Sequence, residues 1–416
     1  MTSQVILGNG FGVAIASDTA VSVFERTYED ARKIRRLRDP HQLAIMCAGG
    51  VNLLGMPVIA LVGQWEQTLA TRLRSVEDYR DSFVAWLERH LDSWSSRSER
   101  DSEALSSLRF EIRWLRDRVQ KRIAALPEEE RLDEALRTLQ ETHDLKRHEC
   151  WDTALAGMAD QILERFSNED LGEGDAPRLE TIVDLFFEEI PRVEKLEHEL
   201  HEYLRRVPGR SYWFPGRANI HLTFVGYGAD ELLPVVSAVE LKGAIENHLS
   251  AVAIETKMAR PFDGGFTLTK PIGQTHVMDL VISGFDRALI EAAVTSVGRS
   301  DLPGGNVMES AEEYVEVTAA DVAAGEPYTE FASAVSEAAS EMAWRTNTEP
   351  FLRTISKLEL ASLAEAAGSL VSVQTLSQNI HGDLPTVGGP IDVATITLSE
   401  GFQWVRRGGR AQDTPD

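Results

Sequence analysis

The stretch that decides the fold is residues 1–50, which read MTSQVILGNGFGVAIASDTAVSVFERTYEDARKIRRLRDPHQLAIMCAGG. Three short apolar runs stand out in it, at residues 5–7, 11–16 and 43–48. Short apolar runs bounded by turn residues are typical of buried strands. Between the first two runs, Gly8-Asn9-Gly10 can supply the positive φ angles that a tight hairpin needs. We therefore expect the chain to begin directly with a hairpin of two buried strands, and expect a third strand to end at Gly49-Gly50.

Thr2 makes this start chemically interesting. Initiator methionine is normally removed when the next residue is as small as threonine, and its removal would leave a free α-amine on the residue that carries the hydroxyl. A threonine hydroxyl is a poor nucleophile alone, but an adjacent N-terminal amine can act as its base. The ordinary pKa of an α-amine is about 7.7–8.0, so a nearby cation could keep it neutral at working pH. Lys33 is the candidate cation, and Asp18 is the candidate carboxylate that would hold it.

These residues resemble the β-type subunits of the proteasome and the bacterial HslV peptidase, which are N-terminal nucleophile hydrolases. The resemblance implies that Thr2 is the nucleophile, that Asp18 and Lys33 form a pair beside it, and that Gly49 donates its backbone N–H to the oxyanion. The loop between Asp18 and Lys33 is one residue shorter than in HslV, a change that a surface loop tolerates. The matching segments, in order, are Thr2-Ser3, residues 12–18 (GVAIASD), residues 33–37 (KIRRL) and residues 48–50 (AGG).

Each of these residues also has a purely structural interpretation. Met1 could stay in front of Thr2, since threonine is common at that position. Asp18 and Lys33 could form a surface ion pair of small energetic value. Gly49 could serve only a strand-to-helix turn. Taken alone, each residue favours its structural interpretation. The order and spacing of all four together favour the N-terminal nucleophile hydrolases.

The second half of the chain departs from the family pattern. The resemblance implies a further catalytic aspartate before the last glycine-containing strand, and Asp383 lies one residue from that place when Gly388-Gly389 are aligned. The serine of that motif falls on Val387. Where the family has Gly-Ser-Gly, this chain has Gly273-Gln274-Thr275. Two alternatives therefore stay open: a catalytically inactive scaffold or assembly subunit, and an amidohydrolase of the same superfamily that acts on a small amide.

Composition narrows the classes of partner. The chain has 416 residues and a formal net charge of -24, and phosphate binding relies on Lys and Arg, so we expect no nucleic-acid partner. No apolar run is long enough to span a bilayer or to form a signal-peptide core. The two cysteines, Cys47 and Cys150, fit a reducing compartment. We expect a cytoplasmic protein that contacts no membrane.

We also expect neither a cofactor nor a metal. His198 and His201 are one residue too close for the zinc-protease arrangement, and Cys150 with its neighbours His148 and Glu149 lacks further ligands at metal-site spacing.

The predicted fold class is α+β, and the resemblance implies a four-layer αββα N-terminal nucleophile sandwich that here contains a large helical insertion. We divide the chain into residues 1–95 and 211–405 as the two parts of this sandwich, residues 96–210 as the charged insertion, and residues 406–416 as a polar, mobile tail. The end of the chain most resembles the bacterial relatives called Anbu. Further helices are expected at 59–73, 76–93, 105–119, 127–165, 179–206, 279–297 and 350–378, with a loop plus a helix at 301–348. Further strands are expected at 220–228, 232–239, 249–256, 387–397 and 401–405.

The resemblance finally implies a peptide or protein as substrate and self-association into a homo-oligomer, with an ATPase or another partner at the insertion as an option. The sequence adds an argument of its own for self-association. Several aromatic residues lie on or beside predicted helices outside the sheet core, and aromatic residues are enriched at interfaces. They are Trp65, Trp86, Trp94, Phe110, Trp114, Trp151 and Phe186.

Overall fold

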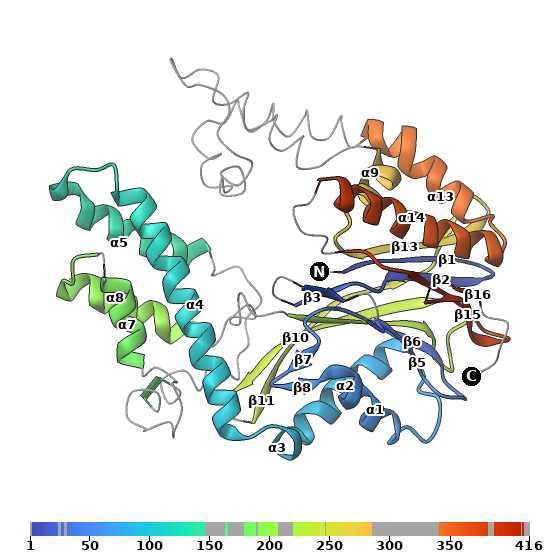
Figure 1. Cartoon of the computed structure of the whole chain (residues 1–416), viewed down its shortest axis with the longest axis horizontal. Coiled ribbons are helices and arrows are strands. Elements are labelled where there is room, and N and C mark those ends of the chain that lie inside the picture. Colours follow the sequence, from blue (N-terminus) through green and yellow to red (C-terminus); the bar gives the residue numbers. More distant parts are fainter. Residues whose placement is uncertain are drawn as a thin grey trace. The chain divides into compact units, whose positions relative to one another are not determined.

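The computed structural model describes residues 2–23, 26–28, 31–145, 163–164, 179–188, 190–206, 219–245, 247–284, 341–381, 387–408 and 410–411 (Figure 1). Helices and antiparallel sheets are both present, so the predicted α+β class is confirmed. The chain forms two compact units. The first comprises Met1–Lys33, Leu232–Pro234 and Met258–Asp416, and the second comprises Ile34–Glu231 and Val235–Lys257.

A seven-stranded antiparallel sheet forms the centre of the first unit. Its strand order is β12-β13-β1-β2-β14-β15-β16. The N-terminal hairpin lies in the middle of this sheet, and every residue of its two strands is buried. The strands are β1 (Ser3–Asn9), β2 (Gly12–Asp18), β12 (Arg260–Phe262), β13 (Gly265–Gly273), β14 (Ile391–Thr397), β15 (Gly401–Arg407) and β16 (Arg410–Ala411).

Helices cover one face of this sheet. They are α9 (His276–Ser283), α13 (Glu349–Ile355), which follows the π-helix η3 (Trp344–Thr348), and α14 (Leu360–His381) (Figure 1). Val5 of β1 and Ala14 of β2 pack with Leu363 and Val371 of α14 in one apolar core. Since successive strand residues point to opposite faces, Ile6 lies on the other face of the sheet, which is therefore apolar as well.

Asn9 explains two differences from the sequence predictions. Gly8 and Asn9 lie inside β1, so the hairpin turn is Gly10-Phe11, and neither Gly8 nor Gly10 is among the glycines with positive φ. The Asn9 side chain makes the turn instead: its Oδ1 accepts from the N–H of Phe11 at 2.9 Å. Its Nδ2 donates to two carbonyl oxygens, of Ile355 at 3.0 Å and of Leu358 at 2.8 Å. The predicted helix at 350–378 is two helices, and Asn9 donates to two carbonyl groups at the break between them.

Smaller differences concern helix and strand ends. The predicted tail at 406–416 is not wholly a tail, because Arg407 ends β15 and residues 410–411 form β16. Helix α9 begins at His276, three residues before the predicted start. The remainder of the helix expected at 279–297, and residues 301–340 of the expected loop and helix, lie outside the described residues.

The second unit is built around a five-stranded antiparallel sheet of order β11-β10-β9-β6-β5. Its core joins the sheet to α1 and α2 through edge-to-face aromatic pairs of Trp65 with Tyr79, Phe83 and Phe224. The strands are β5 (Ile34–Arg36), β6 (Gln42–Gly49), β9 (Ile220–Tyr227), β10 (Val235–Ile245) and β11 (His248–Met258), and the helices are α1 (Val58–Glu66), α2 (Val76–Arg89) and α3 (Leu91–Trp94).

The charged region of the second unit is helical, as predicted, and its helices share an apolar core of their own. They are α4 (Arg97–Ile123), α5 (Glu128–Leu145), α7 (Leu179–Phe187) and α8 (Glu194–Arg206). A capping box between Ser96 and Glu99 starts α4. The single helix predicted at 179–206 is two helices, with Pro191 in the connection, because proline lacks the N–H that a helix interior needs.

Several of the aromatic residues expected at an interface are instead core residues. Trp65, Trp86 and Phe186 are buried within the second unit, and Trp114 packs against the core of the charged helices. Phe110 is exposed, whereas Trp151 lies outside the described residues. Most of these side chains therefore pack within the second unit, and self-association stays a prediction.

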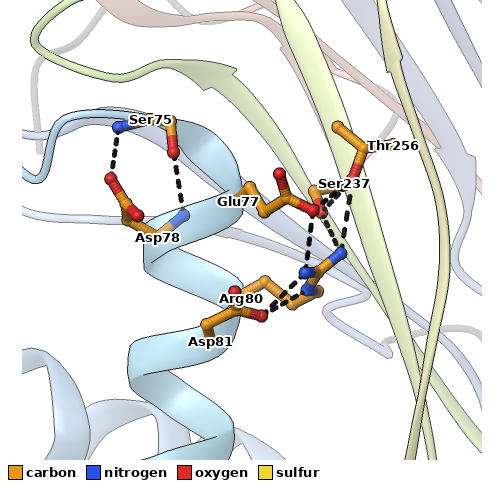
Figure 2. A network of polar contacts seen from close by, with 7 residues as sticks. All are labelled: Ser75, Glu77, Asp78, Arg80, Asp81, Ser237 and Thr256. Carbon is orange, nitrogen blue, oxygen red and sulfur yellow. Dashed lines mark hydrogen bonds and ion pairs between the residues drawn. The ribbon is translucent and has the colours of Figure 1, made fainter.

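A polar network fastens α2 to the five-stranded sheet (Figure 2). Arg80 lies at its centre and is 6% exposed. Its guanidinium donates to Ser237 of β10 at 2.9 Å and to Thr256 of β11 at 3.3 Å. It also pairs with Glu77 at 2.9 Å and with Asp81 at 2.7 Å. This geometry satisfies the buried charge from both the helix and the sheet.

We expect Arg80→Ala to lower the free energy of unfolding by about 2–3 kcal/mol, because Ser237 and Thr256 lose a charged donor and the buried stem leaves a gap. Arg89→Ala is the matched control, since Arg89 is exposed on the same helix, and should stay within about 0.5 kcal/mol of the parent. Urea denaturation measures both. Equal midpoints and slopes for the two variants would show that the network contributes no net stability.

Candidate active site

Asp18 and Lys33 form a buried ion pair in the first unit. Asp18 is the last residue of β2, and the Nζ of Lys33 lies 2.8 Å from its Oδ1. The side chains are 0% and 6% exposed, respectively. A pair so buried is unlike the surface pair considered from the sequence, because removal of both charges from water costs several kcal/mol per ion unless further hydrogen bonds compensate.

Backbone N–H groups supply that compensation. The N–H of Ser3 donates to Oδ1 of Asp18 at 2.9 Å, and the N–H of Gly388 donates to Oδ2 at 3.3 Å. The carboxylate is thus held by β1, by the segment that precedes β14 and by the Lys33 ammonium. Donors on both oxygens fix the orientation of this carboxylate.

Thr2 lies next to this pair, because it precedes Ser3, whose N–H binds Asp18. Thr2 is buried, and its carbonyl oxygen accepts a hydrogen bond from the N–H of Gln274 at 2.8 Å. A Cβ atom on Gly273 would come within 2.1 Å of that oxygen, and the φ of Gly273 is +82°. Only glycine fits such a close approach in this conformation. The main chain of Thr2 is therefore fixed on both sides, by Asp18 through Ser3 and by Gly273-Gln274.

The role of Gly273-Gln274 was missed in the sequence. These residues appeared there only as a departure from Gly-Ser-Gly, and the strand β13 that ends at Gly273 was not predicted. Pro271 and the mixed polar residues of β13 obscured the strand pattern.

Gln374 was missed as well. Its side chain is fully buried on α14, and its Oε1 accepts a hydrogen bond from the N–H of Val277, in the first turn of α9, at 2.8 Å.

Gly49 lies in the second unit, at the end of β6. Its φ is +78°, and a Cβ atom there would lie 2.0 Å from the carbonyl oxygen of Asn219. Turn geometry alone thus accounts for glycine at this position. A short hairpin of β7 (Asn52–Leu53) and β8 (Met56–Pro57) lies between Gly49 and α1. The oxyanion role of Gly49 stays a prediction.

Asp383 lies outside the described residues, so its role also stays a prediction. Val387, which stands where the family has a serine, is buried and precedes Gly388. Through Gly388 this segment contacts Asp18, but at Val387 it brings a hydrocarbon side chain rather than a hydroxyl.

A further buried carboxyl group lies one strand away. Asp392 of β14 stands opposite Ser17 of β2, and its Oδ1 accepts from the N–H of Gly408 at 2.7 Å. Burial raises the pKa of Asp392, while Gly408 and the positive charges of Arg407 and Arg32 oppose the rise. Its bond to Gly408 gives it a structural role at the β15–β16 turn.

No model of a known protein family matches this chain, and no curated protein shows significant sequence similarity to it. Within the described ranges there is no group of three or more His, Cys, Asp and Glu side chains that could hold a metal ion. In the same ranges no helix is both long enough and apolar enough to cross a membrane.

Proposed function

We propose that the chain is a threonine-type N-terminal nucleophile hydrolase, similar to proteasome β-type, HslV and Anbu subunits, that cleaves peptide or other amide bonds through Thr2. The observation that supports this best is the buried Asp18–Lys33 pair, hydrogen-bonded to the N–H that directly follows Thr2. Buried, fixed charge beside a nucleophile is what catalysis of this kind requires.

In the proposed mechanism, the Thr2 hydroxyl oxygen attacks the amide carbonyl carbon while the α-amine of Thr2 takes the hydroxyl proton. The tetrahedral oxyanion accepts a hydrogen bond from the N–H of Gly49. As the carbon–nitrogen bond breaks, the α-ammonium returns the proton to the leaving amine, and an ester on Thr2 remains. Water, deprotonated by the same amine, then hydrolyses the ester. Lys33 favours the neutral amine through its positive charge, and Asp18 holds Lys33 in place.

The proposal includes the four-layer αββα sandwich. Its support comes from within each unit: each antiparallel sheet has helices on one face, α14 and α9 in the first unit and α1 and α2 in the second. The opposite face is apolar too, as Ile6 of β1 and Met46 of β6 illustrate. A sheet that is apolar on both faces must bury both, so such sheets are found with cover on each side.

The experiment that tests the function is hydrolysis of a panel of fluorogenic peptide amides and of an unfolded protein. We expect the parent and Thr2→Ser to cleave at least one of them and Thr2→Ala to cleave none, because serine keeps the hydroxyl and the amine. Cleavage by Thr2→Ala at the parental rate would overturn the proposal.

A second candidate is an inactive scaffold or assembly subunit, which Val387 at the serine position favours. Absence of hydrolysis by a folded chain that begins at Thr2 would support it. A third candidate is an N-terminal nucleophile enzyme that acts on small amides. Adding simple amino-acid amides to the panel distinguishes it from the peptidase and from the inactive scaffold, since only that enzyme would cleave the small amides and leave the peptides intact.

We further propose that the chain forms a homo-oligomer. On the first unit, α14 exposes three apolar residues at helical spacing, Val373, Leu376 and Ile380, the last being 67% exposed. Exposed apolar patches mark interaction sites. Light scattering at micromolar concentration should give a multiple of the monomer mass, and Leu376→Glu should lower it. A monomeric mass for the parent over the whole accessible concentration range would refute self-association.

An ATPase or other partner at the charged helices is part of the same proposal, and co-purification from the native host tests it.

A further inference from the structure

Residues 387–390 form a turn that binds the end of β2 through several hydrogen bonds. The N–H of Gly388 donates to Oδ2 of Asp18 at 3.3 Å. The carbonyl oxygen of Gly388 accepts from the N–H groups of Thr19 at 3.3 Å and Ala20 at 3.0 Å. The hydroxyl of Thr19 donates to the carbonyl oxygen of Pro390 at 2.8 Å. We call residues 387–390 the Asp18 turn.

Of these contacts, the Thr19 hydroxyl bond is the only one made by a side chain, apart from the Asp18 carboxylate itself. Thr19 is 5% exposed, so its hydroxyl is almost fully removed from water. A buried hydroxyl without its acceptor would be unfavourable, and the carbonyl of Pro390 would lose its donor at the same time. The bond therefore ties the Asp18 turn to the residue that directly follows Asp18.

The two oxygens of Asp18 have different partners. Oδ1 accepts from Lys33 and Ser3, while Oδ2 accepts from Gly388. A carboxylate with a donor on each oxygen cannot rotate about its χ2 torsion without breaking bonds. If the Asp18 turn moved away, Oδ2 would be buried without the Gly388 donor, and rotation of the carboxylate would weaken the bond from Oδ1 to Lys33.

We propose that Thr19 is a positioning residue: its hydroxyl holds the Asp18 turn so that Gly388 orients the Asp18 carboxylate toward Lys33. The consequence for catalysis rests on the proposed function, but the effect on Lys33 does not. The alternative is that the hydroxyl merely joins β2 to the start of β14, with no influence on the ion pair.

The test combines two variants of Thr19 and one of the Asp18 turn with a matched control. Thr19→Val removes the hydroxyl and keeps the branched shape, and Thr19→Ser restores the hydroxyl. Gly388→Ala keeps both backbone groups, and its Cβ would lie 3.9 Å from the Cβ of Ala20, an ordinary contact. Thr138→Val is the control, because Thr138 is also buried and also donates to a backbone carbonyl, that of Glu134 in α5, far along the chain from Asp18.

The first readout is the rate at which acetic anhydride acetylates Lys33 in the folded protein, measured by peptide mass spectrometry relative to Lys357. Lys357 is an exposed partner of Asp263 and serves as an internal reference. We expect Thr19→Val to accelerate acetylation of Lys33 about fivefold, the change that loss of one ordinary hydrogen bond gives. Thr19→Ser, Gly388→Ala and Thr138→Val should match the parent.

The second readout is the hydrolysis of whichever amide the parent cleaves. Thr19→Val should lower kcat about fivefold with KM unchanged, and Thr19→Ser should restore kcat. The positioning role is overturned if Lys33 of Thr19→Val is acetylated at the parental rate. It is also overturned if Thr138→Val accelerates the acetylation of Lys33 as much as Thr19→Val does. Both outcomes decide the matter whether or not the chain is an enzyme. Faster acetylation of Lys33 in a chain without hydrolytic activity supports the positioning role and counts against the proposed function alone.

Discussion

Lys33→Ala is expected to lower the rate of amide hydrolysis by roughly 10²–10⁴-fold, the range that loss of general-base catalysis typically gives. The reason is electrostatic. Without the Lys33 cation, 2.8 Å from Asp18 in the parent, the pKa of the Thr2 α-amine rises and less of the neutral base is present at working pH. Residual activity should therefore increase toward higher pH in the variant relative to the parent.

The same substitution leaves the Asp18 carboxylate buried with only its backbone donors, so some loss of stability is expected, and it must be separated from the loss of catalysis. The double variant Asp18→Asn/Lys33→Met removes both charges and keeps the volume of both side chains. We expect it to recover part of the stability, because the amide oxygen of the introduced asparagine can replace only one of the two carboxylate acceptors of the Ser3 and Gly388 N–H groups, and to recover none of the activity. Circular dichroism melts and initial rates on the same samples measure the two effects. Hydrolysis by folded Lys33→Ala at the parental rate would make Lys33 a structural residue.

Gly273→Ala is expected to lower the hydrolysis rate by about 100-fold, the cost that displacement of a reacting group by about 1 Å can have. An alanine Cβ at this position would come within 2.1 Å of the Thr2 carbonyl oxygen, and backbone atoms cannot yield as a flexible side chain can. Thr2 must then move relative to Asp18 and Lys33.

Gly264→Ala is the matched control for this prediction. Gly264 has nearly the same φ, +79°, but an added Cβ would have nothing within 4 Å. Both variants share the penalty of placing alanine in the left-handed region, roughly 1–2 kcal/mol. Only Gly273→Ala adds the collision with Thr2. Initial rates and thermal melts of both variants measure the difference, and equal activity of the two would show that the Gly273 contact does not position Thr2.

The sequence predicted those parts of the site that local patterns can show. The strands β1, β2 and β6 are continuous apolar runs with turn residues at their ends, which is the usual pattern of strands buried on both faces. The order of Thr2, Asp18 and Lys33 along the chain was visible because these residues fall within one short stretch. In the structure Lys33 pairs with Asp18, and the N–H that follows Thr2 binds the same carboxylate, while the catalytic roles of the three residues stay predictions.

Contacts between residues far apart in sequence could not be predicted in the same way. At the break between α13 and α14, two carbonyl groups accept hydrogen bonds from Asn9, hundreds of positions earlier, and Asp18 accepts one from the N–H of Gly388. No local periodicity reports such bonds. Gly273 is a third case, since its conformation matters only because Thr2 approaches it across the β1–β13 pair.

The central claim, that Thr2 is an N-terminal nucleophile, requires a free α-amine on Thr2. The most direct test is therefore the mass of the N-terminal peptide of protein purified from its native host. We expect a peptide that begins at Thr2 with an unmodified amine. A peptide that retains Met1 quantitatively, or that begins at any residue before Thr2, would rule out Thr2 as an N-terminal nucleophile, because its amine would then be part of a peptide bond and could not act as a base.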